Sequence, residues 1–361
     1  IRKSYDRAKE LSRHQLSRVE RRIEDIYYGD TPTFMEVPLA RKSEQLKGAH
    51  AVILGVPYRG ITMKNALVMV PPSVSRSQPG SIYWRTGADR APESIRKYSV
   101  FYSVHHTRGY FMDIDKDLVM QDHINIIDYG DVDVVQEDAE ETLKRTAGKV
   151  DNIIKVGAIP LVLGGDHTIP PFMLKSILAP RKKKIGLITF DAHLDLSYEP
   201  EYWCASPWTR VLESGKLSPR NFVEIGIRGT RNGIFAKNVT EGLGHRVATI
   251  DEVKEKGIKE IMSEALELLK DETDGIYVSM DLDVMEPSQV PSQKAPEIWG
   301  LTIDEMMLAL RMLSREDIIG FDICEYTPDY DINGMGAQFV ARCVVEILGG
   351  IALRIRDSSK D

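Results

Sequence analysis

Cysteine and long apolar stretches are both scarce in this chain, and each shortage excludes a class of protein. The 361 residues include three scattered cysteines, Cys204, Cys324 and Cys343, and no CxxC pair. An odd set of thiols without close spacing is neither a disulfide framework nor a thiolate zinc site. No run approaches the roughly 18 apolar residues of a membrane span, and the amino end is polar rather than signal-like. We therefore expect a protein of the reducing cytoplasm.

An excess of basic residues is also lacking. Lys and Arg number 47 against 54 Asp and Glu, which gives a formal net charge of −7 and an isoelectric point near 5.7. Nucleic acids and anionic membranes normally need a concentrated basic surface. We therefore expect neither as a partner.

The first segment of the chain is charged, with apolar positions three to four residues apart. This spacing predicts an amphipathic helical extension that packs or makes oligomer contacts. We assign residues 1–48 to this extension and residues 49–361 to a single catalytic domain.

After residue 48, short apolar runs that end in Gly, Asp or Pro alternate with segments of helical period. Such alternation predicts an α/β fold with a mainly parallel sheet and helices on both faces. The predicted strands are 51–56, 124–129, 160–165, 185–191, 222–227, 246–250, 275–281 and 318–323. The predicted helices are 91–98, 141–156, 252–269, 303–313 and 338–354. A Gly-, Pro- and Ser-rich stretch from Arg59 to Ala88 predicts a loop that shapes or covers a site.

Three short motifs follow three of these strands: GGDHT, DAHLD and SMDLD. In open α/β sheets, ligands bind beyond the carboxyl ends of the strands, so the motifs share one rim. Alternate residues of an extended segment face the same way, so five of the side chains can point at one centre, with a histidine from a separate turn. The candidate ligands are His167, Asp191, His193, Asp195, Asp281 and Asp283.

So many buried carboxylates and imidazoles would repel one another without cations. Oxygen and imidazole donors without thiolate suit Mn²⁺, Ni²⁺, Fe²⁺ or Zn²⁺. Bridging carboxylates would hold two such ions about 3.5–4 Å apart, the spacing that generates a reactive hydroxide at neutral pH. We expect two divalent ions per subunit, Ni²⁺ or Mn²⁺.

These motifs resemble those of the arginase/agmatinase (ureohydrolase) family, and further similar segments follow in the same order over most of the chain. The resemblance implies a three-layer α/β/α fold with an eight-stranded sheet and a homotrimer, homohexamer or hetero-oligomer. It also implies a metal-dependent hydrolase whose bridging hydroxide attacks a guanidinium carbon and releases urea and an amine.

The resemblance assigns roles to individual residues. The six candidate ligands match those of the two ions, and Asp195 also matches the carboxylate that orients the hydroxide. Glu325 matches the glutamate that holds the guanidinium, and a carboxylate suits a planar donor fork through bidentate pairing.

Two departures from the family pattern point to an unusual substrate. The histidine of an HG pair that shuttles protons is absent from the stretch 198–208, and nothing in the sequence says what replaces it. In the loop 285–300, glycines are replaced by Ser292, Lys294 and Trp299, which must change the pocket volume. Trp203, Trp208 and Trp299 supply aromatic surface that can lie against a flat cation.

Members that resemble this chain in its helical arm and in the aromatic residues after DAHLDL include guanidine and biguanide hydrolases. We therefore expect hydrolysis of a small guanidine or biguanide, such as guanidine or metformin. One alternative is an agmatinase or guanidino-acid hydrolase. Another is a non-catalytic scaffold subunit paired with an active paralogue, although a silent subunit has no reason to keep the whole ligand set.

Overall fold

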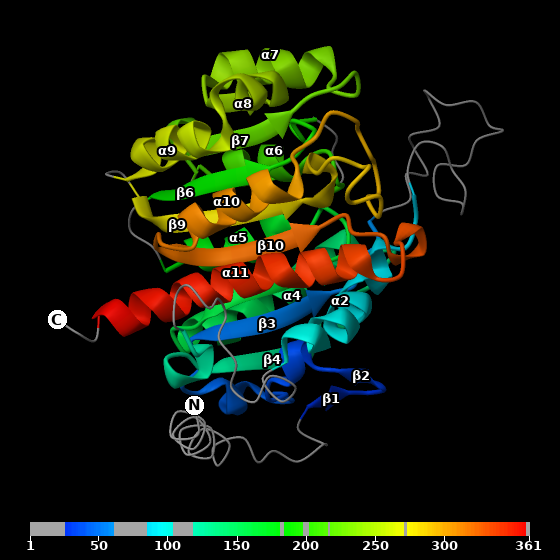
Figure 1. Cartoon of the computed structure of the whole chain (residues 1–361), viewed down its shortest axis with the longest axis vertical. Helices are drawn as coiled ribbons and strands as arrows, with labels where there is room; N and C mark the ends of the chain where they lie inside the picture. Colours follow the sequence, from blue (N-terminus) through cyan, green and yellow to red (C-terminus); the bar gives the residue numbers. More distant parts are fainter. Residues whose placement is uncertain are drawn as a thin grey trace, which may run out of the picture.

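An eight-stranded sheet forms the centre of the protein. The computed structural model describes residues 26–60, 85–103, 118–180, 184–197, 202–215, 217–270 and 273–358. All neighbouring strands of the sheet are parallel, in the order β4-β3-β5-β10-β9-β6-β7-β8 (Figure 1). The strands are β3 (Ala51–Val56), β4 (Ile126–Asp131), β5 (Ile159–Gly164), β6 (Lys184–Phe190), β7 (Phe222–Ile227), β8 (Arg246–Thr249), β9 (Thr273–Asp281) and β10 (Ile318–Cys324).

The predicted parallel sheet is confirmed, and each predicted strand overlaps an observed one. Strands such as β3, β7 and β10 are buried along their whole length. Burial on both faces is what the continuous apolar runs indicated. The chain order breaks where β10 lies between β5 and β9, and such a switch point is where open α/β sheets bind ligands.

Two helical layers cover the sheet (Figure 1). Consecutive contacts join α2, α11, α10 and α9 in one layer, and α4, α5 and α6 in the other. Each layer buries its own apolar cluster against the sheet, so the three-layer prediction is confirmed. The helices are α2 (Ala91–Ser99), α4 (Ala139–Lys155), α5 (Pro170–Leu178), α6 (Pro207–Glu213), α7 (Ile234–Leu243), α8 (Ile250–Lys256), α9 (Ile258–Leu269), α10 (Ile303–Leu313) and α11 (Met335–Ser358).

The helices differ from prediction in two ways. The predicted helix 252–269 is split into α8 and α9 at Gly257, whose φ of 87° ends the first helix. Helices α5, α6 and α7 were not predicted. In α5 almost every side chain is buried, so the sequence has no polar face to reveal a helical period.

The amino-terminal segment also differs from prediction. Residues 1–25 of the predicted helical extension, and residues 61–84 of the predicted loop, lie outside the described residues. Residues 26–48 are not α-helical: β1 (Tyr27–Tyr28) pairs with β2 (Thr31–Pro32), and two short 3-10 turns follow. Proline at 32 and 38 opposes a continuous helix. The side chain of Phe34 is fully buried, so this segment packs into the same core as the sheet.

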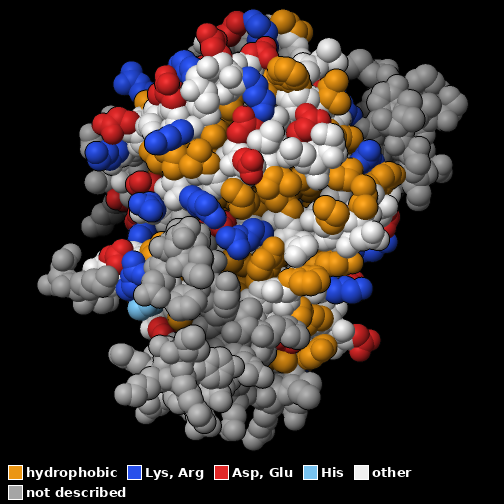
Figure 2. Space-filling view, in the orientation of Figure 1, with side chains coloured by type: hydrophobic (Ala, Val, Ile, Leu, Met, Phe, Trp, Pro, Cys, Tyr) orange, Lys and Arg blue, Asp and Glu red, His pale blue; other side chains and the backbone are white. Residues whose placement is uncertain are grey.

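Helix α11 is long and apolar enough to cross a membrane by length and composition alone. However, 83% of its most apolar window is buried inside the protein, as expected of a core helix. Figure 2 shows the molecule in the orientation of Figure 1, with hydrophobic side chains over the middle of the visible face and basic and acidic side chains interspersed around them.

Candidate active site

The three motifs lie together at the carboxyl ends of β5, β6 and β9, because parallel strands deliver their ends to one edge. A repeated turn then sets the spacing within each motif. In every case an aspartate accepts a hydrogen bond from the backbone N–H two residues later, the pattern of an Asx turn. These bonds are Thr168 N to Asp166 Oδ1 (2.8 Å), His193 N to Asp191 Oδ1 (2.7 Å) and Asp283 N to Asp281 Oδ1 (2.8 Å).

Around His167, three carboxylates form the first group of candidate metal ligands. The Nδ1 atom of His167 lies 2.8 Å from Asp195 Oδ2, 3.3 Å from Asp191 Oδ2 and 3.3 Å from Asp281 Oδ2. Ligand atoms of the four residues all lie within 4.8 Å of one another, and the group is almost entirely buried.

A second group adjoins the first and shares Asp191 with it. The Nδ1 atom of His193 lies 3.0 Å from Asp283 Oδ2 and 3.7 Å from Asp191 Oδ1. Asp191 thus presents one oxygen to each group, as a carboxylate between two ions must. The structure therefore brings all six predicted ligands together, as two groups that share a bridging carboxylate.

The imidazole of His167 is held with one nitrogen toward the carboxylates. Its Nε2 lies 3.0 Å from Ser279 Oγ, and the Ser279 hydroxyl donates to Asp322 Oδ1 at 2.9 Å. Because the hydroxyl has one proton, Ser279 must accept a hydrogen bond from His167 Nε2–H. In the neutral imidazole this leaves the Nδ1 lone pair for a metal. Sequence reasoning missed the roles of Ser279 and Asp322, although Ser279 lies two residues before Asp281 and Asp322 three residues before Glu325.

The electrostatics of the two groups fit divalent ions. Burial, and then the charges of Asp195 and Asp283, raise the pKa of Asp191 well above its ordinary value. Burial lowers the pKa of His193. The nearby carboxylates of Asp283, Asp191 and Asp195 together outweigh burial and raise this pKa to about 9. Asp191 Oδ2 is buried and has no hydrogen-bond partner among the described residues. Four carboxylates, one of them with this oxygen, and two imidazoles form a donor set that accommodates two divalent ions.

Across from these groups, Glu325 follows the end of β10. Its Oε1 accepts a hydrogen bond of 2.7 Å from the backbone N–H of His167, whereas its buried Oε2 has no partner among the described residues. Glu325 has a φ of 65°, a strained conformation for a non-glycine residue that is found mostly at functional sites. Burial raises the pKa of Glu325 to about 7, although Lys294 acts in the opposite direction.

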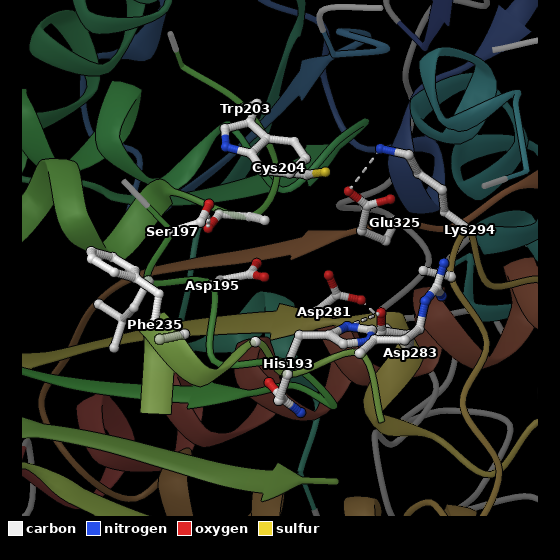
Figure 3. Close-up of a pocket in the computed structure, with 17 residues that line it drawn as sticks. His193, Asp195, Ser197, Trp203, Cys204, Phe235, Asp281, Asp283, Lys294 and Glu325 are labelled. Carbon is white, nitrogen blue, oxygen red and sulfur yellow. Dashed lines mark hydrogen bonds and ion pairs between the residues drawn. The ribbon is translucent and has the colours of Figure 1, made fainter. Parts of the chain in front are cut away.

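A cavity of about 260 Å³ separates Glu325 from the two groups. Figure 3 shows Asp195, His193, Asp281 and Asp283 on one side, with Glu325 and Lys294 on the other. The remaining wall is largely apolar or uncharged, apart from Arg231. It includes Leu196, Ser197, Trp203, Cys204, Ala205, Asn232, Gly233, Phe235, Ala236 and Ala295.

The three tryptophans predicted for the pocket have different positions. Trp203 lines the cavity. Trp208 does not line it: its ring is fully buried and packs edge-on against His167, with 5.4 Å between the ring centroids. Trp299 is 61% exposed and does not line the cavity either. The predicted pocket role is therefore wrong for these two, because Trp208 lies in the core and the backbone turns Trp299 toward solvent.

Lys294, Cys204 and Arg231 also line the cavity. Sequence reasoning named only Lys294, as a residue that changes the pocket volume, and gave none of the three a contact. For Lys294 a signal existed, since a long side chain replaces a glycine of the family loop. Its ammonium group donates to Asp166 and, at 3.3 Å, to Glu325 Oε1. Oε1 is thus already bonded, so bidentate pairing of Glu325 with a substrate, as predicted, does not fit this arrangement.

Comparison with known proteins agrees with this geometry. The sequence model of the arginase family matches residues 50–349. The guanidinopropionase of Pseudomonas aeruginosa is 28% identical over 328 residues, 89% of this chain and 92% of that protein. The human mitochondrial guanidino acid hydrolase is 30% identical over 268 residues, 73% of each chain. The solved structure of proclavaminate amidino hydrolase from Streptomyces clavuligerus superposes with a TM-score of 0.75 and 25% identity, covering 91% of this chain and 99% of that one.

Proposed function

This chain belongs to the arginase family, and on that basis we propose that it hydrolyses a small guanidine or biguanide. One observation carries the proposal. Glu325, whose Oε2 has no hydrogen-bond partner among the described residues, lines the cavity opposite the two ligand groups, and a guanidinium between them would meet a carboxylate on one side and metal ligands on the other.

In this proposal, His167, Asp191, Asp195 and Asp281 hold one ion, and Asp191, His193 and Asp283 contribute to the other. Two divalent ions held there would supply activated water for attack on carbon. Asp195 orients the attacking water, and Glu325 holds the amidine group through Oε2. Guanidine and water then give urea and ammonia, whereas 1,1-dimethylbiguanide and water give guanylurea and dimethylamine.

The size of the cavity favours a small substrate. Its volume of about 260 Å³ falls just below the 300–1,000 Å³ that is typical of ligand pockets. Arg231 also lines the cavity.

A guanidino acid is the second candidate, because Arg231 could pair with a substrate carboxylate. Two of the relatives are named for guanidino acids, namely the guanidinopropionase and the human guanidino acid hydrolase.

The scaffold alternative is disfavoured because all six candidate ligands and Glu325 are retained in one buried arrangement. We propose Ni²⁺ or Mn²⁺ as the metal, since both accept oxygen and imidazole ligands. A homotrimer, homohexamer or hetero-oligomer in the cytoplasm remains our prediction.

A substrate panel on the purified single chain tests the proposal. Protein produced with Ni²⁺ or with Mn²⁺ is analysed for metal, then assayed with guanidine, guanylurea, 1,1-dimethylbiguanide, 3-guanidinopropionate, agmatine and arginine. Products are urea, or guanylurea with dimethylamine. We expect the first three to react fastest; faster hydrolysis of agmatine or arginine would refute the proposal, and faster hydrolysis of 3-guanidinopropionate would favour the second candidate.

A further inference from the structure

Lys294 places a positive charge of the protein's own beside Glu325. Asp166, Cys204 and Glu325 bring candidate ligand atoms within 4.8 Å of one another, which is the kind of cluster that binds a cation. The Lys294 ammonium pairs with both carboxylates of this cluster, and its side chain is 11% exposed. Lys294 therefore already supplies the cation that this side of the cavity requires.

The position of Lys294 is fixed from several directions. Its backbone N–H donates to Glu325 O at 3.0 Å, and its carbonyl accepts from Arg85 N at 2.9 Å. Asp166 is held in turn by Thr168 and lies against Gly60, where a Cβ atom would come within 2.3 Å of Asp166 Oδ2. A side chain at residue 60 would displace Asp166, so glycine at this position permits the close approach of the backbone to Asp166.

Lys294 and Glu325 present opposite hydrogen-bonding characters to the cavity. An ammonium group has three N–H donors. Among the described residues, Lys294 Nζ bonds only to Asp166 and to Glu325 Oε1, so one donor remains. Next to it, Glu325 Oε2 is an acceptor without a partner in the described part of the chain. Lys294 and Glu325, which both line the cavity, thus leave one donor and one acceptor unused among the described residues.

We propose that Lys294 is a specificity-determining residue that makes this wall select a guanidine carrying a hydrogen-bond acceptor next to the amidine carbon. This inference rests on the proposed function and narrows its substrate class. The carbonyl of a guanylurea, or the bridging nitrogen of a biguanide, would accept from Lys294 while an adjacent N–H donates to Glu325 Oε2. Guanidinium has donors only, so it would satisfy Glu325 but offer no acceptor to the Lys294 ammonium.

The test compares binding of guanylurea, 1,1-dimethylbiguanide and guanidinium by calorimetry, with hydrolysis measured in parallel. Wild-type protein should bind the two acceptor-bearing compounds more tightly than guanidinium. In Lys294→Met this preference should fall by about 10- to 100-fold, the effect of one hydrogen bond to a charged group. Lys294→Arg, which keeps a cationic donor, should restore part of it.

Two further variants separate specificity from folding and from general charge. Lys294→Met leaves two carboxylates without their cation, so Asp166→Asn is added to it to restore the net charge of the wall. The double variant should still lack the preference. Lys254→Met removes a lysine from an ion pair with Glu305 outside the cavity and should leave the preference unchanged.

The outcomes are distinct for the two proposals. If wild-type protein binds guanidinium as tightly as guanylurea and the biguanide, or if Lys294→Met keeps the preference, the role of Lys294 is refuted. If the binding preference and its loss are as expected but no compound is hydrolysed, the role of Lys294 is supported and the proposed function fails.

Discussion

The two sides of the cavity neutralise their carboxylates in different ways. On one side, four aspartates surround two histidines, and no lysine or arginine pairs with the ligand oxygens among the described residues. On the other, Asp166 and Glu325 share Lys294. The first side needs cations from solution, whereas the second carries its own cation.

This difference separates two tasks that one cluster of acidic residues could not perform together. Carboxylates without a protein cation can bind metal ions, and they can change their interaction partners when a metal ion or a ligand binds. Carboxylates paired with a lysine keep one set of hydrogen-bond partners, which suits recognition. Substitutions on the two sides should therefore have different effects on metal content and on substrate binding.

On the side without a protein cation, removal of the shared ligand Asp191 should weaken both metal binding and catalysis. In Asp191→Asn the bridging carboxylate becomes a neutral amide of the same shape, so neither group keeps its full ligand set. Metal ions contribute several kcal/mol to charge stabilisation, so we expect kcat/KM to fall by about 10³-fold or more. Elemental analysis should show fewer than two ions per chain. Asp151→Asn, on the exposed surface of α4, is the matched control, and two bound ions with full activity in Asp191→Asn would contradict the assignment.

A substitution on the side that carries Lys294 should instead weaken substrate binding and leave the metal content unchanged. In Glu325→Gln the acceptor facing the cavity loses its charge, while Oε1 can still accept from His167 N. Loss of one charge-assisted hydrogen bond should lower kcat/KM by about 10- to 100-fold. Metal content, measured on the same preparation, should stay at two ions per chain. Loss of an ion from this variant would mean that the two sides are not separate.

The same contrast explains what sequence could predict. Apolar runs between polar turns identified all strands of the sheet, and the DxH and DxD spacings identified the ligands because one Asx turn repeats at three strand ends. These signals are local. The contact of Lys294 with Asp166 joins residues 128 positions apart, and no local pattern encodes it. Similarly, the core position of Trp208 depends on packing against Phe222 and His167, so its residue type alone suggested a pocket.

When the metal ions are removed, protons should bind to the imidazoles and carboxylates of the first side. The pH dependence of protein stability should reveal this exchange. The folded-state pKa of His193 is about 9, above its ordinary 6.5, so its contribution to stability is complete below pH 6.5 and is lost as pH rises to 9. The raised pKa values of His167, Asp191 and Asp281 act in the same direction. That of Asp283 is lowered, and its effect is confined to acidic pH.

Chelator-treated protein should therefore lose stability between pH 6.5 and 9, by a Tm change on the order of 5 °C. Metal-loaded protein should lose less, because metal ligands must be deprotonated and rising pH favours binding. Thermal melts of both forms across this range measure the gap. A gap that narrows as pH rises would contradict the proton-for-metal exchange.

Trp299 belongs to neither side, and its replacement should have the smallest effect. Its φ of 68° is a left-handed conformation that costs about 1–2 kcal/mol for a residue with a side chain. Glycine removes this strain but adds about 0.5–1 kcal/mol of backbone entropy cost, so Trp299→Gly should be up to about 1.5 kcal/mol more stable. Denaturant unfolding measures this difference. Since the exposed indole does not line the cavity, kcat/KM should be unchanged. A fall in kcat/KM beyond about tenfold, the size of one 1.4 kcal/mol interaction, would instead show that the indole reaches substrate and that the cavity has a third side.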